Sequence, residues 1–189
     1  MVRERKLIVE EIENLKMVLS KYRIDTSGWG QGTTKTVENL LEEILKGESI
    51  LVEDKNGLLR VVRYSRVYVY YIDGDHEYQL IEDRQEFANG KVRRRGFKHL
   101  SEKCILNQPP QEAAREGVVK ELSITTPVHL KYIGQGKEAI TRFPSYPGLK
   151  SYSHFFNFKG YLDPSQYSPA GYQEVTPKKT TYFVWKQIK

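Results

Sequence analysis

Residues 102–124 read EKCILNQPPQEAAREGVVKELSI, and this stretch decides the fold that the sequence predicts. Pro109 and Pro110 suit the first turn of a helix, because the N–H that proline lacks has no helical partner there in any case. The apolar residues that follow recur at helical spacing and would form one inner stripe, made by Ala113, Ala114, Val118 and Leu122. We therefore expect a loop, a helix over residues 109–122 and a loop exit.

Strand-like segments lie on both sides of this helix. Upstream, Ile50–Glu53 and Leu58–Ile72 flank an Asn-Gly turn, which is a strong hairpin signal. The segments Glu77–Asp83 and Phe87–Arg95 follow, the second as a tight ribbon with its own Asn-Gly pair. Downstream, we expect strands near residues 128–134, 137–143, 150–161 and 179–187.

The N-terminal residues have a different character. Apolar side chains recur at helical spacing over residues 6–23, and a second helix is expected from Thr36 to a stop signal at Gly47. We therefore expect a helical extension over residues 1–47 and a main domain over residues 48–189. The order of helices, strands, central helix and strands predicts an α+β fold, or an α/β/α sandwich if the N-terminal helices pack on the sheet.

Composition bounds the class of protein. The chain has 189 residues, a formal net charge of +6 and one cysteine, Cys104. A single cysteine cannot form an intrachain disulfide, and no apolar run approaches the roughly 18–20 residues that a membrane helix requires. We expect a cytoplasmic protein with no membrane partner. Its positive charge favours anionic ligands without identifying a nucleic-acid-binding protein.

The segment 102–124 resembles the Nudix box, the loop–helix–loop motif of the Nudix hydrolase-like superfamily. The box has the pattern G-x5-E-x7-R-E-U-x-E-E-x-G-U, where U is an aliphatic residue. Fixed on the Ala-Ala pair and on the end of the segment, the pattern aligns without gaps, and it is kept at Val118, Glu121 and Ile124. The resemblance implies a Nudix-like α/β/α sandwich with a mixed sheet over residues 48–189.

The same alignment reveals a degenerate box. In the family, glutamates on one helical face hold Mg²⁺ or Mn²⁺ against a substrate diphosphate, and the metal activates water. Here Gly117 and Lys120 replace two of those glutamates, while Glu102 and Ser123 take the two glycine positions. Among the helical ligand positions only Glu121 keeps a carboxylate, so it is a vestigial candidate. We expect no catalytic residue, no metal site and no cofactor.

Basic residues near the box suggest a different use for the fold. A lysine at a former metal position can neutralise phosphate as a cation would, and arginine can clamp phosphate through paired hydrogen bonds. The phosphate-binding residues that we expect are Arg93, Arg94, Arg95, Lys103 and Lys120.

Three functional hypotheses follow. The favoured one is a non-catalytic Nudix-like protein that binds a nucleotide or another phosphate-bearing ligand, RNA included. The second is a diverged hydrolase of nucleoside-diphosphate-linked substrates that needs Mg²⁺ or Mn²⁺, with substitute ligands drawn from Glu82, Asp83, Glu86 and Glu102. The third is a protein-interaction scaffold that uses the tyrosine-rich surface and the N-terminal helices, with a protein partner or as a homodimer.

Overall fold

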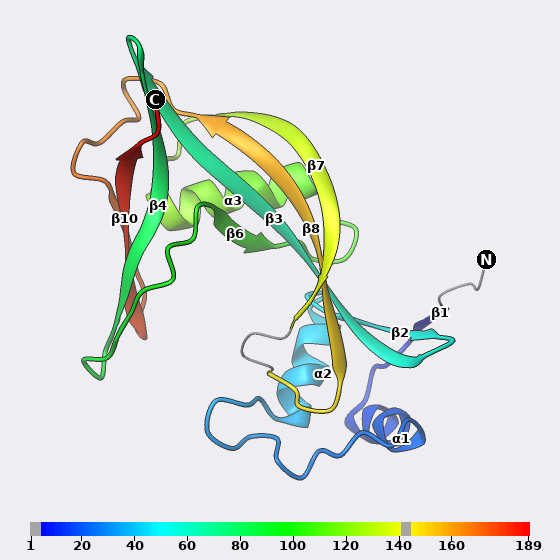
Figure 1. Ribbon diagram of the computed structural model, residues 1–189. Coiled ribbons are helices and arrows are strands. Elements are labelled where there is room, and N and C mark those ends of the chain that lie inside the picture. The colour runs from blue at the N-terminus through cyan, green and yellow to red at the C-terminus, as the bar shows by residue number, and fades with distance from the viewer. Residues whose placement is uncertain (1–4, 141–144) are drawn as a thin grey trace. The chain divides into compact units, whose positions relative to one another are not determined.

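The computed structural model describes residues 5–140 and 145–189 and has an α+β fold (Figure 1). In this part of the chain, ten strands form one sheet and three helices accompany it. The strands are β1 Arg5–Leu7, β2 Ile50–Asp54, β3 Gly57–Asp73, β4 His76–Phe87, β5 Val92–Arg93, β6 Leu100–Lys103, β7 His129–Ala139, β8 Lys150–Tyr161, β9 Tyr172–Val175 and β10 Lys179–Gln187. The helices are α1 Ile12–Lys21, α2 Val37–Leu45 and α3 Pro110–Leu122. The α+β class predicted from the sequence is confirmed.

The chain divides into two compact units. Unit 1 comprises Met1–Arg63, Lys103–Gln108 and Gly136–Phe155, and unit 2 comprises Tyr64–Glu102, Pro109–Gln135 and Phe156–Lys189. This division differs from the boundary predicted after residue 47, because strand residues after that boundary share one core with the N-terminal helices. Domains over residues 1–47 and 48–189 stay a prediction.

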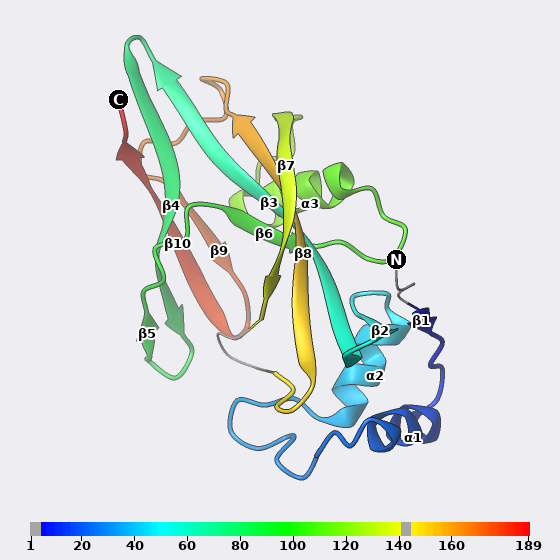
Figure 2. The same cartoon turned by 45° about the vertical axis from the view of Figure 1, so that its right-hand side comes forward.

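Unit 1 contains the predicted helical pair (Figure 2). Leu15 and Leu19 lie one turn apart on α1 and are both buried. A capping box between Thr36 and Asn39 starts α2. The buried core consists of Val9, Leu15, Leu19, Trp29, Leu40, Leu51, Leu58, Tyr146 and Leu149. The first helix was predicted to begin at residue 6, which is wrong, because Arg5–Leu7 instead pairs with β2.

A buried ion pair joins α2 to β3 within unit 1. The guanidinium of Arg60 donates to Glu43 at 2.6 Å, and the Ser49 hydroxyl donates to the same carboxylate oxygen at 2.8 Å. Burial alone would raise the pKa of Glu43, but the Arg60 charge and the hydrogen bonds from Lys35, Arg60 and Ser49 lower it to about 2. Arg60 therefore belongs to the buried interior of unit 1.

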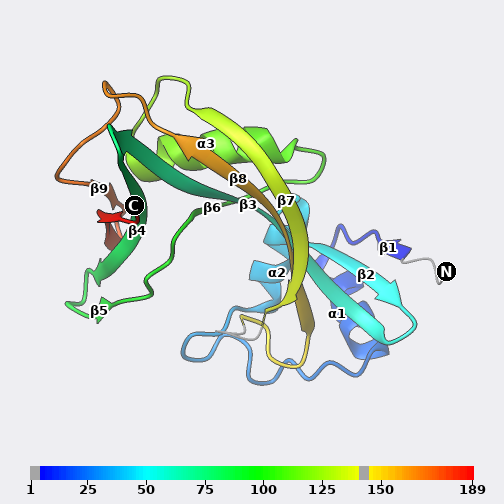
Figure 3. The ribbon, with the colours of Figure 1, turned by 45° about the horizontal axis from the view of Figure 1, so that its top comes forward.

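Unit 2 is built around α3. The helix buries Ala113, Ala114, Gly117, Val118 and Leu122, which includes the predicted inner stripe. In Figures 1 and 3, α3 lies along β6 and the neighbouring stretches of β3 and β8. The buried core consists of Val67, Val69, Leu80, Leu100, Ala114, Val118, Leu122, Ile124, Val128, Leu130, Phe158, Leu162 and Phe183. In the described residues, no helix combines the length and apolar character that crossing a membrane requires.

The strand predictions are confirmed in most places. The segments 150–161 and 179–187 match β8 and β10. The two strands predicted around Gly134 are one strand, β7, which continues through the glycine in its pairing with β8. The predicted end of the second of these strands, residues 141–143, lies outside the described residues. Neither β6 nor β9 was predicted, since both are short.

Candidate functional site

The helix α3 ends in a residue with left-handed backbone conformation. The helix ends at Ser123, whose φ of 58° is left-handed, and its N–H donates to the Val119 carbonyl at 2.9 Å. Left-handed backbone after a helix favours glycine, because a Cβ is strained there. Ser123 adopts this left-handed conformation although it has a Cβ.

Gly117 on α3 and Glu102 on β6 lie against each other. A Cβ added to Gly117 would lie 3.1 Å from the Cβ of Glu102 on β6. The side chain of Glu102 thus occupies the room that a side chain at position 117 would need.

The ammonium group of Lys120 lies beside the carboxylate of Glu102. Lys120 donates to Glu102 at 2.8 Å and lies 3.6 Å from a carboxylate oxygen of Glu116. The hydrogen bond from Lys120 to Glu102, more than the coulombic attraction between them, raises the pKa of Lys120. The ammonium group of Lys120 therefore lies between the carboxylates of Glu102 and Glu116.

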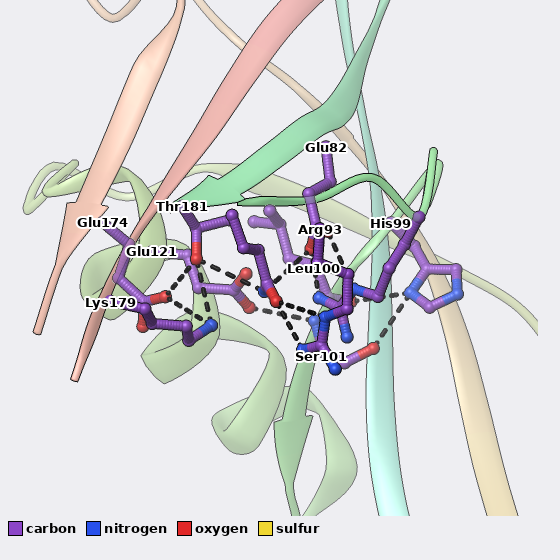
Figure 4. Close-up of polar contacts among 11 residues, drawn as sticks. Glu82, Arg93, His99, Leu100, Ser101, Glu121, Glu174, Lys179 and Thr181 are labelled. Atoms are coloured by element: carbon purple, nitrogen blue, oxygen red, sulfur yellow. Dashed lines mark hydrogen bonds and ion pairs between the residues drawn. The ribbon is translucent and has the colours of Figure 1, made fainter. Parts of the chain in front are cut away.

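A cavity of about 250 Å³ opens beside the C-terminal part of α3. Its walls come from β4, the segment before β6, β6, α3, β9 and β10, all within unit 2. The lining residues are Glu82, Gln85, Arg95, Phe97, His99, Ser101, Glu102, Glu121, Glu174, Lys179 and Thr181. Figure 4 shows polar contacts of several of them, together with Arg93 and Leu100, with side chains from β4, α3 and β10 pointing toward one another.

Glu121 lies at the wall of this cavity in an environment that favours its protonated form. It is half-buried, and the backbone N–H of Ser101 donates to it at 2.9 Å. Burial raises the pKa of Glu121 to about 8, with the charges of Glu174 and Glu102 adding to the effect. The hydrogen bond from Ser101 and the charge of Lys179 oppose it. The surroundings of Glu121 therefore disfavour its charged form.

Carboxylates do gather at the cavity, yet they do not form a metal cluster. Across residues 5–140 and 145–189, no group of three or more His, Cys, Asp or Glu side chains is placed to hold a metal ion. Of the substitute ligands considered from the sequence, Glu82 and Glu102 line the cavity. Glu82 forms an ion pair with Arg95, and Asp83 and Glu86 form ion pairs with Arg84.

The ribbon arginines have separate partners in the structure. Arg95 donates from Nε to Glu82 at 2.8 Å and lies over the ring of Phe97. Arg93 donates to the Gln85 amide oxygen at 3.1 and 2.5 Å. The exposed side chain of Arg94 instead donates to Asp83 at 2.5 Å. Arg95 lines the cavity itself, and Arg93 contacts the cavity residue Gln85.

The two predicted lysines belong to different units. Lys120 is in unit 2, whereas Lys103 is in unit 1, where it donates to Glu48 at 2.5 Å and lies 4.0 Å from Glu43. Neither lysine is among the residues that line the cavity, although Lys120 binds the lining residue Glu102. A role for Arg93, Arg94, Arg95, Lys103 or Lys120 in phosphate binding stays a prediction.

Sequence reasoning missed the contribution of β9 and β10. Lys179 donates to Thr181 at 3.0 Å and lies 3.7 Å from Glu174. The alternation of Lys179 and Thr181 along a strand places them on one face, but only the pairing of β10 with β4 brings that face to the box. A register shift between Tyr182 and Phe183 also puts Glu82 and Gln85, three positions apart, on the same buried side.

Comparison with known proteins leaves the family open. No protein-family model matches the sequence, and no curated protein does. Among solved structures, an Ap4A hydrolase of C. elegans is 14% identical over 66% of this chain and 79% of that chain, with a TM-score of 0.36. The NUDIX domain of Shewanella oneidensis NrtR, complexed with ADP ribose, is 7% identical over 65% and 70%, with a TM-score of 0.37. An ADP compounds hydrolase is 18% identical over 74% and 66%, with a TM-score of 0.28. Likenesses of this strength do not assign the chain to a family.

Proposed function

We propose that unit 2 is a Nudix-like domain that binds a phosphate-bearing ligand of the nucleotide type without hydrolysing it. The observation that carries the proposal is the Lys120 ammonium, held 2.8 Å from Glu102 beside Gly117. Water activation in such a site requires a metal with an open coordination position. An ammonium group supplies positive charge but has no such position, so it favours binding over hydrolysis.

The cavity supplies the kinds of group that such a ligand requires. Arg95 and Lys179 are its cationic side chains, and the hydroxyls of Ser101 and Thr181 add neutral hydrogen-bonding groups. Charged donors of this kind recognise phosphate oxygens. Their present carboxylate partners, Glu82 and Glu174, keep both cations oriented within the cavity.

Aromatic side chains at the cavity suit a nucleobase. The rings of Phe97 and His99 are stacked, with centroids 5.5 Å apart and an interplanar angle of 20°. Both residues line the cavity. Stacking on aromatic rings is tolerant of base identity, so this feature supports a nucleotide without selecting one base.

Thermal unfolding with ADP as the probe, in EDTA, tests the proposal. We expect ADP to raise the melting temperature of the intact protein, and Lys179→Ala to weaken ADP binding about tenfold, as for loss of one charged hydrogen bond. The matched control is Lys178→Ala, which removes an exposed neighbouring lysine outside the cavity and should leave binding unchanged. Absence of an ADP-dependent rise in melting temperature would contradict the proposal, and so would Mg²⁺-dependent phosphate release from ADP in a separate assay without EDTA.

The hydrolase hypothesis retains one specific observation in its favour. Glu82, Glu102, Glu121 and Glu174 all line the same cavity, and carboxylates crowded together attract divalent cations. If a metal joined them, it would lower the pKa of Glu121, and Mn²⁺ would be expected to stabilise the protein. The scaffold hypothesis, RNA binding, a protein partner and a cytoplasmic location stay predictions.

A further inference from the structure

Unit 1 has a cavity of its own, of about 450 Å³, formed by its strands. Its walls come from β2, the β2–β3 turn, β3, β7 and β8. The lining residues are Ile50, Val52, Asp54, Asn56, Leu59, Val61, Arg63, Lys137, Lys150, Tyr152 and His154. The β2–β3 hairpin that provides much of this surface is visible in Figure 3.

The floor of this groove is an apolar face of the sheet. Ile50 pairs with Val61 and Val52 pairs with Leu59 across β2 and β3. Side chains alternate along a strand, so these residues lie on the opposite face from Leu51, which packs in the helical core of unit 1. The floor is therefore a second apolar surface, separate from the core.

The rim of the groove is predominantly cationic. Arg63, Lys137 and Lys150 line it, and Asp54 is the carboxylate among the lining residues. The pKa of His154 is lowered by burial first, and then by the charges of Lys137 and Arg63. The same positive field that disfavours a proton on His154 would attract an anion.

We propose that this groove binds a small amphipathic anion, with a carboxylate or phosphate head at Arg63, Lys137 and His154 and an apolar body over the floor and Tyr152. Its volume falls within the roughly 300–1,000 Å³ that is usual for small-molecule sites. An apolar floor with a few convergent polar groups is also the usual composition of such sites. The groove lies wholly in unit 1, so this inference does not depend on the ligand proposed for unit 2.

Fluorescence titration of the intact protein with 8-anilino-1-naphthalenesulfonate, an aromatic anion, tests this site. We expect the dye to bind and to be displaced by decanoate or decyl phosphate, whereas decanol at equal concentration displaces it poorly. Comparing the two anions shows which head group the site prefers. Absence of dye binding, or displacement by decanol as strong as by decanoate, would overturn the proposal.

Charge reversal on β7 provides matched variants. Lys137→Glu should weaken dye binding about tenfold or more, because it replaces an attractive charge with a repulsive one. Lys131→Glu makes the same change at an exposed position of β7 outside the groove and should have no effect. Val61→Asp, in the half-buried floor, should also abolish binding. Equal dye affinities for Lys137→Glu and Lys131→Glu, with both variants folded, would reject the site.

Discussion

At the scale of single residues, Glu43 and Glu121 show how surroundings decide the ionisation of one side-chain type. Glu43 has a buried guanidinium at 2.6 Å, and its pKa falls to about 2. Glu121 accepts a backbone hydrogen bond but has Glu174 and Glu102 as charged neighbours, and its pKa rises to about 8. The first carboxylate is stabilised in its charged form by the ion pair in unit 1, and the second is destabilised in its charged form by burial beside the cavity of unit 2.

Replacement of Glu43 should be costly and dependent on pH. We expect Glu43→Gln to lower the free energy of unfolding at pH 7 by about 3 kcal/mol, because it leaves the buried Arg60 without its counter-ion. The folded-state pKa lies below the usual value of 4.5. The contribution is therefore fully present above about pH 4.5 and is lost as the pH falls toward 2. Urea unfolding at pH 7 and pH 3 measures both effects.

The exposed neighbour Glu42 is the control for this prediction. It forms an ion pair with Lys46 at 2.7 Å, and both side chains are 58% exposed. Glu42→Gln should change stability by less than about 0.5 kcal/mol, as exposed helical pairs usually do. A loss in Glu43→Gln that is the same at both pH values would show that the ion pair is not its source.

At the scale of elements, α3 shows what the sequence can and cannot predict. Its apolar spacing and its two prolines predicted the helix almost to the residue, because these signals are local. The left-handed conformation of Ser123 was not predicted, since serine at a helix end does not signal it. The proximity of Glu102 and Gly117 was not predicted, since it arises where β6 and α3 pack together.

The left-handed end of α3 gives an element-scale prediction. Ser123→Gly should raise the free energy of unfolding by about 1 kcal/mol, because glycine adopts a φ of 58° without the strain of a Cβ. Ser123→Ala, which retains a Cβ, is the matched control and should differ little from the native protein. Destabilisation by Ser123→Gly would mean that the helix does not end in this conformation.

Predictions from sequence were weakest where distant strands meet. Arg93, Arg94 and Arg95 were recognised from the sequence as basic residues near the box. Their individual partners depend on the pairing of β4 with β5. Lys179 and Thr181 reach the cavity through the pairing of β10 with β4. No local pattern marks such residues, because their role depends on contacts between segments far apart in the chain.

At the scale of the whole molecule, the net charge is +6, and cationic side chains line a cavity in each unit. Unit 2 has a cavity in which cations are held by carboxylates, and unit 1 has a groove with a cationic rim over an apolar floor. We propose that both bind anions, although four glutamates also line the unit 2 cavity. The account of unit 2 further requires that its anion be bound without a metal.

Titration of the intact protein with Mn²⁺, followed by electron paramagnetic resonance, tests that requirement directly. The triple variant E102G/G117E/K120E provides the comparison, because it returns the carboxylates to the helix and removes the Glu102 side chain that a larger residue at position 117 would meet. We predict that the native protein leaves the free-ion signal unchanged at about 1 mM Mn²⁺, a concentration that fills weak carboxylate sites, while the variant reduces it. Stoichiometric Mn²⁺ binding by the native protein would contradict the account, and failure of the variant to bind would reject the alignment of the box.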